Sequence, residues 1–156
     1  MTTLTQIQSF LGRKRLAVVG VSRYPQDFTR TLYQELARRN YDVVPVNPEV
    51  REIAGVPCYA HVDEIQPPVD AALLMTKPAV TEIVVRECQA AGIRDIWMYR
   101  GGGTGAVSPR AVEFCQANGM SVVEGECPFM FLPETPWFHR FHGFCRKLVG
   151  SYPKEN

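Results

Sequence analysis

Residues 16–22 read LAVVGVS, a short apolar run that ends in a glycine turn. The run from Leu16 to Val19 is too short for a helix and rich in β-branched side chains, which is typical of a strand buried on both faces. A polar stretch follows Gly20, and a helix is expected to begin near Thr29. This order opens a nucleotide-binding βαβ unit, because the glycine lets the backbone approach a ligand and the helix start offers free N–H groups to phosphate.

The composition is that of a single ordinary globular domain. The chain has 156 residues, of which 46% are hydrophobic and 21% charged, and its formal net charge is +1. So small a charge argues against a broad surface for nucleic acid. The first fifteen residues lack the apolar core of a signal peptide, and no stretch approaches the roughly 20 apolar residues of a membrane span. We therefore predict a cytoplasmic protein that binds neither nucleic acid nor membrane.

Strands and helices are expected to alternate along the chain. After the first strand we predict strands at 41–46, 70–76, 94–99 and 120–124. We predict helices at 3–11, 29–39, 78–92 and 108–119, and only one helical turn, at 62–65, between residues 49 and 69. On the third of these helices, Val80, Ile83, Val84 and Cys88 are expected to face the sheet. Such a chain folds as a three-layer α/β domain with a five-stranded parallel sheet, whose ligand lies beyond the carboxyl ends of the strands.

Six pieces of the sequence, taken in order, carry a family resemblance. They are AVVGVSRYP at 17–25, YDVVPVNP at 41–48, VPCYAHVDEI at 56–65, VDAALLMTKP at 69–78, AAGIRDIWMYRG at 90–101 and GMSVVEGECP at 119–128. Together they resemble the stand-alone CoA-binding proteins, and the CoA-binding domain of succinyl-CoA synthetase α subunits and of NDP-forming acyl-CoA synthetases. The resemblance implies a Rossmann-like CoA-binding domain over residues 1–132 and a separate aromatic tail over 133–156.

The resemblance also implies where coenzyme A or an acyl-CoA would lie. Carried over position by position, it places Gly20, Val21 and Ser22 at the diphosphate, Asn47 and Pro48 at the adenosine end, Thr76 and Lys77 at the exit of the third strand, and Met98, Tyr99 and Arg100 near the pantetheine. The phosphates of the ligand need cations, and the predicted rim supplies Arg23, Arg30, Lys77 and Arg100. Replacing Gly20 by valine is expected to abolish CoA binding and to leave the fold nearly intact.

Two sequence patterns point to other chemistry and are weaker. Gly20-x-Ser22 lacks the last glycine of a GxSxG nucleophile elbow, which favours a phosphate-binding hydroxyl at Ser22 over a nucleophile. Residues 101–106, GGGTGA, match a dinucleotide fingerprint, but they follow the fourth strand rather than the first. An NAD site would also require Asp or Glu at the position of Asn47, to bind the ribose. An NAD(P)-binding enzyme or redox sensor therefore remains an alternative, as does a docking subunit of a larger acyl-CoA enzyme.

The tail and the cysteines suggest no metal site. His139, His142 and Cys145 recur every three residues on a short helix expected from Trp137 to Val149, a spacing that an amphipathic face also produces. The five cysteines are Cys58, Cys88, Cys115, Cys127 and Cys145, without a CxxC pair, so neither a disulfide framework nor a zinc ribbon is indicated. The aromatic side chains of the tail are a candidate homodimer contact. No histidine lies in a recognisable catalytic loop, so we predict binding rather than catalysis.

Overall fold

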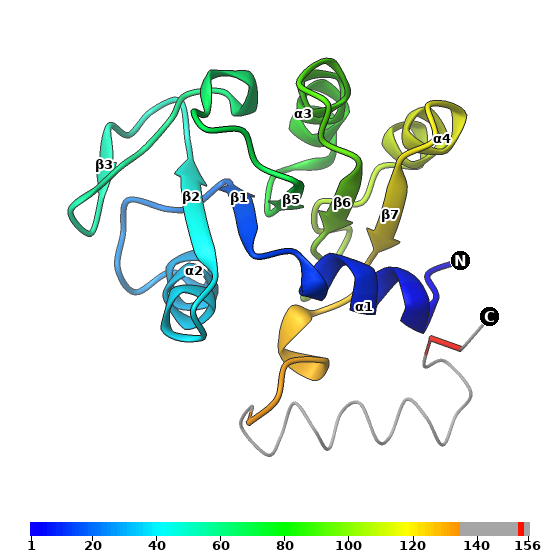
Figure 1. Ribbon diagram of the computed structural model, residues 1–156, viewed down its shortest axis with the longest axis horizontal. Coiled ribbons are helices and arrows are strands. Elements are labelled where there is room, and N and C mark those ends of the chain that lie inside the picture. The colour runs from blue at the N-terminus through cyan, green and yellow to red at the C-terminus, as the bar shows by residue number, and fades with distance from the viewer. Residues whose placement is uncertain (135–152, 155–156) are drawn as a thin grey trace.

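A computed structural model describes residues 1–134 and 153–154 of the chain. Its centre is the predicted five-stranded sheet, in which all neighbouring strands are parallel (Figure 1). The strand order is β2-β1-β5-β6-β7. The bounds of these strands are Arg15–Val19 for β1, Asp42–Val46 for β2, Ala71–Leu74 for β5, Asp95–Met98 for β6 and Ser121–Glu124 for β7.

The helices begin and end close to the predicted positions. Their bounds are Leu4–Gly12 for α1, Phe28–Arg38 for α2, Pro78–Ala90 for α3 and Pro109–Ala117 for α4, with short 3-10 helices η1 at Val62–Glu64 and η2 at Pro128–Met130. Thr3 forms a capping box with Gln6 at the start of α1, and Ser108 caps α4 ahead of its N1 proline. Both helix starts can be predicted from the sequence, because a capping side chain and the amide that it binds lie within one turn of each other.

The sheet is covered on both faces, so the domain has the three predicted layers. Figure 1 shows α3 and α4 on one side of the sheet and α1 and α2 on the other. Along β1, Ala17 and Val19 pack into the core under α3 and α4, whereas Leu16 and Val18 pack into the core under α1 and α2. Each of these four side chains is at most 4% exposed. Burial on both faces explains why β1 reads as a continuous apolar run.

The predicted buried face of α3 is wrong in part. Val80 is 44% exposed and Ile83 is 60% exposed, and the helix buries Thr81, Val84, Val85 and Cys88 instead. The helix is rotated because the Thr81 hydroxyl is satisfied inside the protein, 2.7 Å from Thr76 Oγ1 and 3.3 Å from the Lys77 carbonyl. A polar side chain with local partners can thus replace an apolar one at the interface with the sheet.

The connection between β2 and β5 holds more structure than was expected. The helical turn at 62–65 is confirmed as η1, but a two-stranded hairpin was missed, formed by β3 (Glu52–Ile53) and β4 (Val56–Pro57). Ala54 and Gly55 form its turn with φ of 52° and 79°. Strands of two residues are too short to show alternation, so the sequence carries little signal for them.

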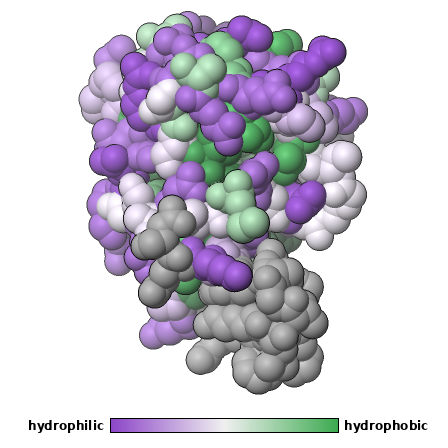
Figure 2. Space-filling view, turned by 90° about the vertical axis from the view of Figure 1, so that its right-hand side faces the viewer, coloured by the Kyte–Doolittle hydropathy of each residue, from purple (hydrophilic) through white to green (hydrophobic). Residues whose placement is uncertain are grey.

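The start of the chain lies at the free edge of the sheet. Thr2 Oγ1 accepts a hydrogen bond from the Glu124 amide (2.8 Å), and Lys154 bridges to Thr3. Figure 2 looks onto the side of the molecule that carries α4, β7 and the N-terminus, where apolar residues gather in the middle of a largely polar face. The predicted tail helix and its His139, His142 and Cys145 lie outside the described residues. None of the helices in the described ranges is long and apolar enough to cross a membrane.

Candidate functional site

The strand order reverses between β1 and β5, and the candidate site lies at this switch point. The chain leaves β1 toward α2 on one face of the sheet and leaves β5 toward α3 on the other. In open α/β sheets the ligand crevice lies at such a point, at the carboxyl ends of the two strands. Gly20 begins the first loop with a φ of 91°, and its amide donates to the Val46 carbonyl (2.9 Å). A Cβ at Gly20 would lie 2.6 Å from the Met75 carbonyl oxygen, so the two loops touch at this glycine.

Side chains from neighbouring elements bind the carbonyl groups of the first loop. Asn47 Nδ2 donates to the Val21 carbonyl (2.9 Å), while Asn47 Oδ1 accepts from the Glu49 amide (2.9 Å). Arg30 lies under the loop, only 6% exposed, and its Nη1 donates to the carbonyls of Ser22 (3.4 Å) and Arg23 (3.3 Å). Three successive carbonyl oxygens are therefore engaged by the protein.

Several amide groups of the same loop are left without a protein acceptor. The Ser22 amide donates to Thr29 Oγ1 (3.0 Å), but the amides of Arg23, Phe28 and Thr29 have no acceptor among the described residues. The N-cap residue Asp27 makes no side-chain hydrogen bond to the first turn of α2. An uncapped helix start beside exposed loop amides favours an anion.

The second loop carries Thr76 and Lys77 to the same edge. Thr76 is half-buried with its hydroxyl bound to Thr81, whereas Lys77 is exposed and its carbonyl accepts from the Val80 and Thr81 amides (2.9 Å each). Lys77 makes no side-chain cap at the start of α3. Two helix starts and an exposed ammonium group therefore lie at the same edge of the sheet, where its strands have their carboxyl ends.

The loop after β6 brings only one predicted residue to the start of α2. Tyr99 is half-buried and stacks on Phe28, with ring centroids 5.2 Å apart and planes at 20°; burial raises the pKa of its hydroxyl to about 12. Met98 is wholly buried in the core. Arg100 is exposed and lies toward Gly125, where it lines a cavity of about 220 Å³ with Glu124. The pair Phe28 and Tyr99 forms an aromatic wall beside the first loop.

The glycine-rich loop closes on its own backbone. The Ala106 amide donates to the Tyr99 carbonyl (2.8 Å). Gly105 has a φ of 55°, and a Cβ at this position would lie 2.5 Å from the same carbonyl oxygen, so no larger residue fits there. The start of α4 is already capped by Ser108, whose hydroxyl also donates to Glu82 (2.7 Å). A dinucleotide fingerprint needs a free helix start for the pyrophosphate, so this loop does not have the geometry of one.

The described residues show no activated nucleophile at the site. The Ser22 hydroxyl accepts from the Tyr24 amide (3.1 Å), an interaction within its own turn. Burial raises the pKa of the thiols of Cys58 and Cys127, and that of Cys115 to about 11, so these thiols stay protonated at neutral pH. In residues 1–134 and 153–154, no three His, Cys, Asp or Glu side chains are grouped to hold a metal.

Sequence reasoning missed Phe28 and Thr29 as parts of the site. Thr29 orders the first loop through the Ser22 amide, and Phe28 joins that loop to Tyr99. Neither role follows from a spacing pattern, because the first depends on how the loop folds back on the start of α2 and the second on how α2 is set against the loop after β6. Pro48, by contrast, is exposed next to Asn47, and its place at the adenosine end stays a prediction.

Comparison with known proteins gives the family. Residues 14–133 match the model of the CoA binding domain. The uncharacterized protein YneT of Bacillus subtilis (strain 168) is 26% identical over 123 residues, covering 78% of this chain and 88% of that protein. ADP-forming acetate–CoA ligase I of Archaeoglobus fulgidus is 30% identical over 120 residues, covering 73% of this chain but only 18% of the ligase. The solved structure of a hypothetical protein from Pyrococcus horikoshii OT3 is 25% identical, with a TM-score of 0.74 over 82% of this chain and 87% of that one.

The match extends from the residue before β1 to the end of the described domain, and it includes every loop of the candidate site. The same parallel sheet recurs in the solved relative. This chain belongs to the CoA binding domain family.

Proposed function

We propose that the protein binds coenzyme A or an acyl-CoA in the crevice between the loops after β1 and β5, and that it catalyses no reaction by itself. The family match supports an association with CoA. The observation that carries the proposal is the loop at 20–29, whose carbonyl groups are bound by Asn47 and Arg30, while the amides of Arg23, Phe28 and Thr29 lack acceptors among the described residues. Such a loop suits a diphosphate.

In this proposal some predicted residues contact the phosphates of the ligand, and Arg30 positions the loop that binds them. Gly20, Val21 and Ser22 form the floor under the diphosphate, and the exposed cations Arg23 and Lys77 supply charge at the rim. Arg30 acts from beneath the loop as a positioning residue, because it is buried and its bonds go to backbone carbonyls.

The remaining residues are assigned along the length of the ligand. Asn47 and Pro48 border the adenosine end, and Thr76 lies between the two loops. Tyr99, stacked on Phe28, offers an apolar wall to the pantetheine. Met98 contributes through core packing, and Arg100 lines the small cavity beside β7.

The NAD(P) alternative is disfavoured by the bonds of Asn47. In a dinucleotide site, the residue at the end of this strand accepts hydrogen bonds from a ribose. Both ends of the Asn47 carboxamide are already engaged by the Val21 carbonyl and the Glu49 amide. The held carboxamide offers a ribose one neutral oxygen, where Asp or Glu would offer two charged ones.

A second candidate function is a docking subunit of a larger acyl-CoA enzyme. It is favoured by the relatives that are ADP-forming acetate–CoA ligases, of which the chain spans 12% to 27% of the length. Purification of the tagged protein from its own cells tests this role, because a stable ligase partner should co-purify in stoichiometric amounts. The homodimer through the tail is a separate proposal, which sedimentation velocity of the intact chain tests.

Isothermal titration of the intact protein with CoA, acetyl-CoA, NAD and NADP tests the main proposal. We expect saturable binding of CoA with a Kd on the order of micromolar and no comparable heat with the nicotinamide nucleotides. Tight NAD binding without a response to CoA would overturn the proposal. The variant Arg30→Gln should bind CoA roughly tenfold more weakly, which is about 1.4 kcal/mol, whereas Arg110→Gln, an exposed change on α4, should bind as the parent does.

A further inference from the structure

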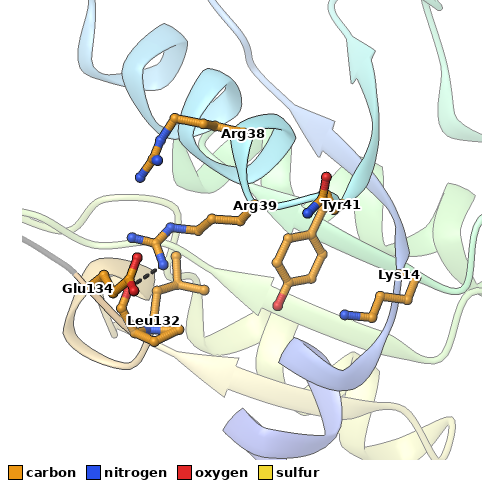
Figure 3. A pocket seen from close by; sticks show the side chains of 8 residues that line it. Lys14, Arg38, Arg39, Tyr41, Leu132 and Glu134 are labelled. Atoms are coloured by element: carbon orange, nitrogen blue, oxygen red, sulfur yellow. Dashed lines mark hydrogen bonds between the residues drawn. The ribbon is translucent and has the colours of Figure 1, made fainter.

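A cavity of about 420 Å³ lies away from the CoA crevice, at the opposite end of α2. Figure 3 shows it between the end of α2, the approaches to β1 and β2, and the segment after η2. Eight residues line it: Lys14, Arg38, Arg39, Asn40, Tyr41, Leu132, Pro133 and Glu134. The helix between this cavity and the crevice has 11 residues, so roughly 16 Å separates its two ends.

The walls of the cavity are held in place by hydrogen bonds. Arg39 Nε donates to Glu35 (2.8 Å), and Arg39 Nη1 donates to the Pro133 carbonyl. The Tyr41 hydroxyl donates to the Leu11 carbonyl (2.7 Å), and Lys14 Nζ lies 5.1 Å from the centroid of the Tyr41 ring. The Arg39 guanidinium is therefore held by the fold, whereas Arg38 and Lys14 are exposed at the rim of the cavity.

Positively charged side chains outnumber carboxylates around the cavity. Lys14, Arg38 and Arg39 face the carboxylates of Glu134 and Glu35, and a single Glu35 oxygen serves both arginines at 2.8 Å. The Nη2 atom of Arg39 is buried and has no hydrogen-bond partner among the described residues. A buried guanidinium N–H without an acceptor is costly, and guanidinium groups are good donors to oxyanions.

We propose that this cavity is a second anion-binding site, for a small molecule that carries a phosphate or carboxylate group. Guanidinium groups match the geometry of both oxyanions, and Lys14 adds a point charge from the other wall. The site is separate from the CoA crevice, since it lies at the amino end of β1 and the crevice lies at its carboxyl end.

Titration of the intact protein with inorganic phosphate, and separately with acetate, tests the proposal at constant ionic strength. Residue-specific amide chemical shifts distinguish binding in the cavity from binding in the crevice. We expect amide chemical shifts of Arg39 and Tyr41 to move with a Kd on the order of millimolar. The anion that binds more tightly identifies the preferred group.

The double variant Lys14→Gln, Arg38→Gln removes two cations from the cavity wall and should weaken this binding at least tenfold. The matched control Arg51→Gln, Arg110→Gln removes the same charge from exposed positions elsewhere and should bind as the parent does. Equal binding by the two double variants, or no binding of either anion by the parent, would overturn the proposal. Both double variants should retain CoA binding. A parent protein that does not bind CoA would contradict the proposed crevice and not this cavity.

Discussion

The two ends of α2 are both suited to anions, but they use different donors. At its start, backbone amides lack acceptors, and the loop before it is held by Asn47 and Arg30. At its end, the donors are the side chains of Arg38 and Arg39, which share the carboxylate of Glu35. A helix start carries a partial positive charge in its backbone, whereas a helix end must recruit cationic side chains.

This difference predicts how each end responds to mutation. Backbone donors are kept in every substitution except one by proline, so the start of α2 is sensitive mainly to changes in the residues that shape its loop. Side-chain donors can be removed one at a time, so the other end should lose anion affinity gradually with little loss of fold.

The largest expected effect is that of Gly20→Val. A Cβ at Gly20 would lie 2.6 Å from the Met75 carbonyl oxygen, and its φ of 91° is unfavourable for any L side chain. We expect a loss of about 3 kcal/mol in the free energy of unfolding, measured by urea denaturation. This corrects the sequence-based expectation of a nearly intact fold. Gly102→Ala, with nothing within 4 Å of its Cβ, should be close to neutral, and equal stability of both variants would contradict the account.

Asn47→Ala should have the next largest effect, because it removes the hydrogen bond from the end of β2 to the Val21 carbonyl of the first loop and a second one from the Glu49 amide. We expect a loss of about 2 kcal/mol in stability together with weaker CoA binding, followed by urea denaturation and titration calorimetry. Asn118→Ala is a matched control, since its carboxamide donates to the Phe114 carbonyl (2.8 Å) far from the crevice. Asn118→Ala should lose stability and keep its affinity for CoA. An equal loss of CoA affinity in the two variants would contradict the role of Asn47 in the site.

At the other end of α2, Asn40 has a φ of 64° at the point where the helix has ended. Asn40→Ala should cost about 1 kcal/mol of stability because alanine tolerates this backbone region poorly, while Asn40→Gly should cost nothing. Thermal denaturation of the two variants provides the measurement. CoA binding should be unchanged in both, and a change there would show that the two ends are not independent.

The smallest expected effect is a pH dependence from Glu35. The hydrogen bond from Arg38 is the largest cause that lowers the pKa of its carboxyl from 4.5 to about 2; burial opposes it, and the hydrogen bond from Arg39 lowers the pKa further. Because the folded pKa is depressed, this stabilisation is present above pH 4.5 and is lost as the pH falls toward 2. Solvent screening limits it to about 1 kcal/mol.

Urea denaturation at pH 6 and pH 3 compares the parent with Glu35→Gln. The variant should lose less stability on acidification than the parent, by about 1 kcal/mol. Glu113→Gln, an exposed change on α4, should follow the parent. An identical pH dependence in all three proteins would show that the pairing at the end of α2 contributes nothing.

Much of the fold could be predicted from the sequence because its signals are local. Burial on both faces makes Leu16 to Val19 continuously apolar. Thr3 and Ser108 cap helices within a single turn, and Pro109 occupies the first position of α4. The rotation of α3 could not be predicted, because it depends on a hydroxyl contact between Thr76 and Thr81 across the start of a helix.

The candidate site divides in the same way. The sequence by itself determined the strand, the Gly20 turn and the helix that follow one another at the carboxyl edge, since periodicity and a single glycine encode them. Only the tertiary structure decided that Arg30 lies under the loop, that Asn47 binds the Val21 carbonyl, and that Arg38, Arg39 and Lys14 enclose a cavity. These arrangements join residues far apart in the chain, and their geometry is fixed by how the strands pair and the helices pack.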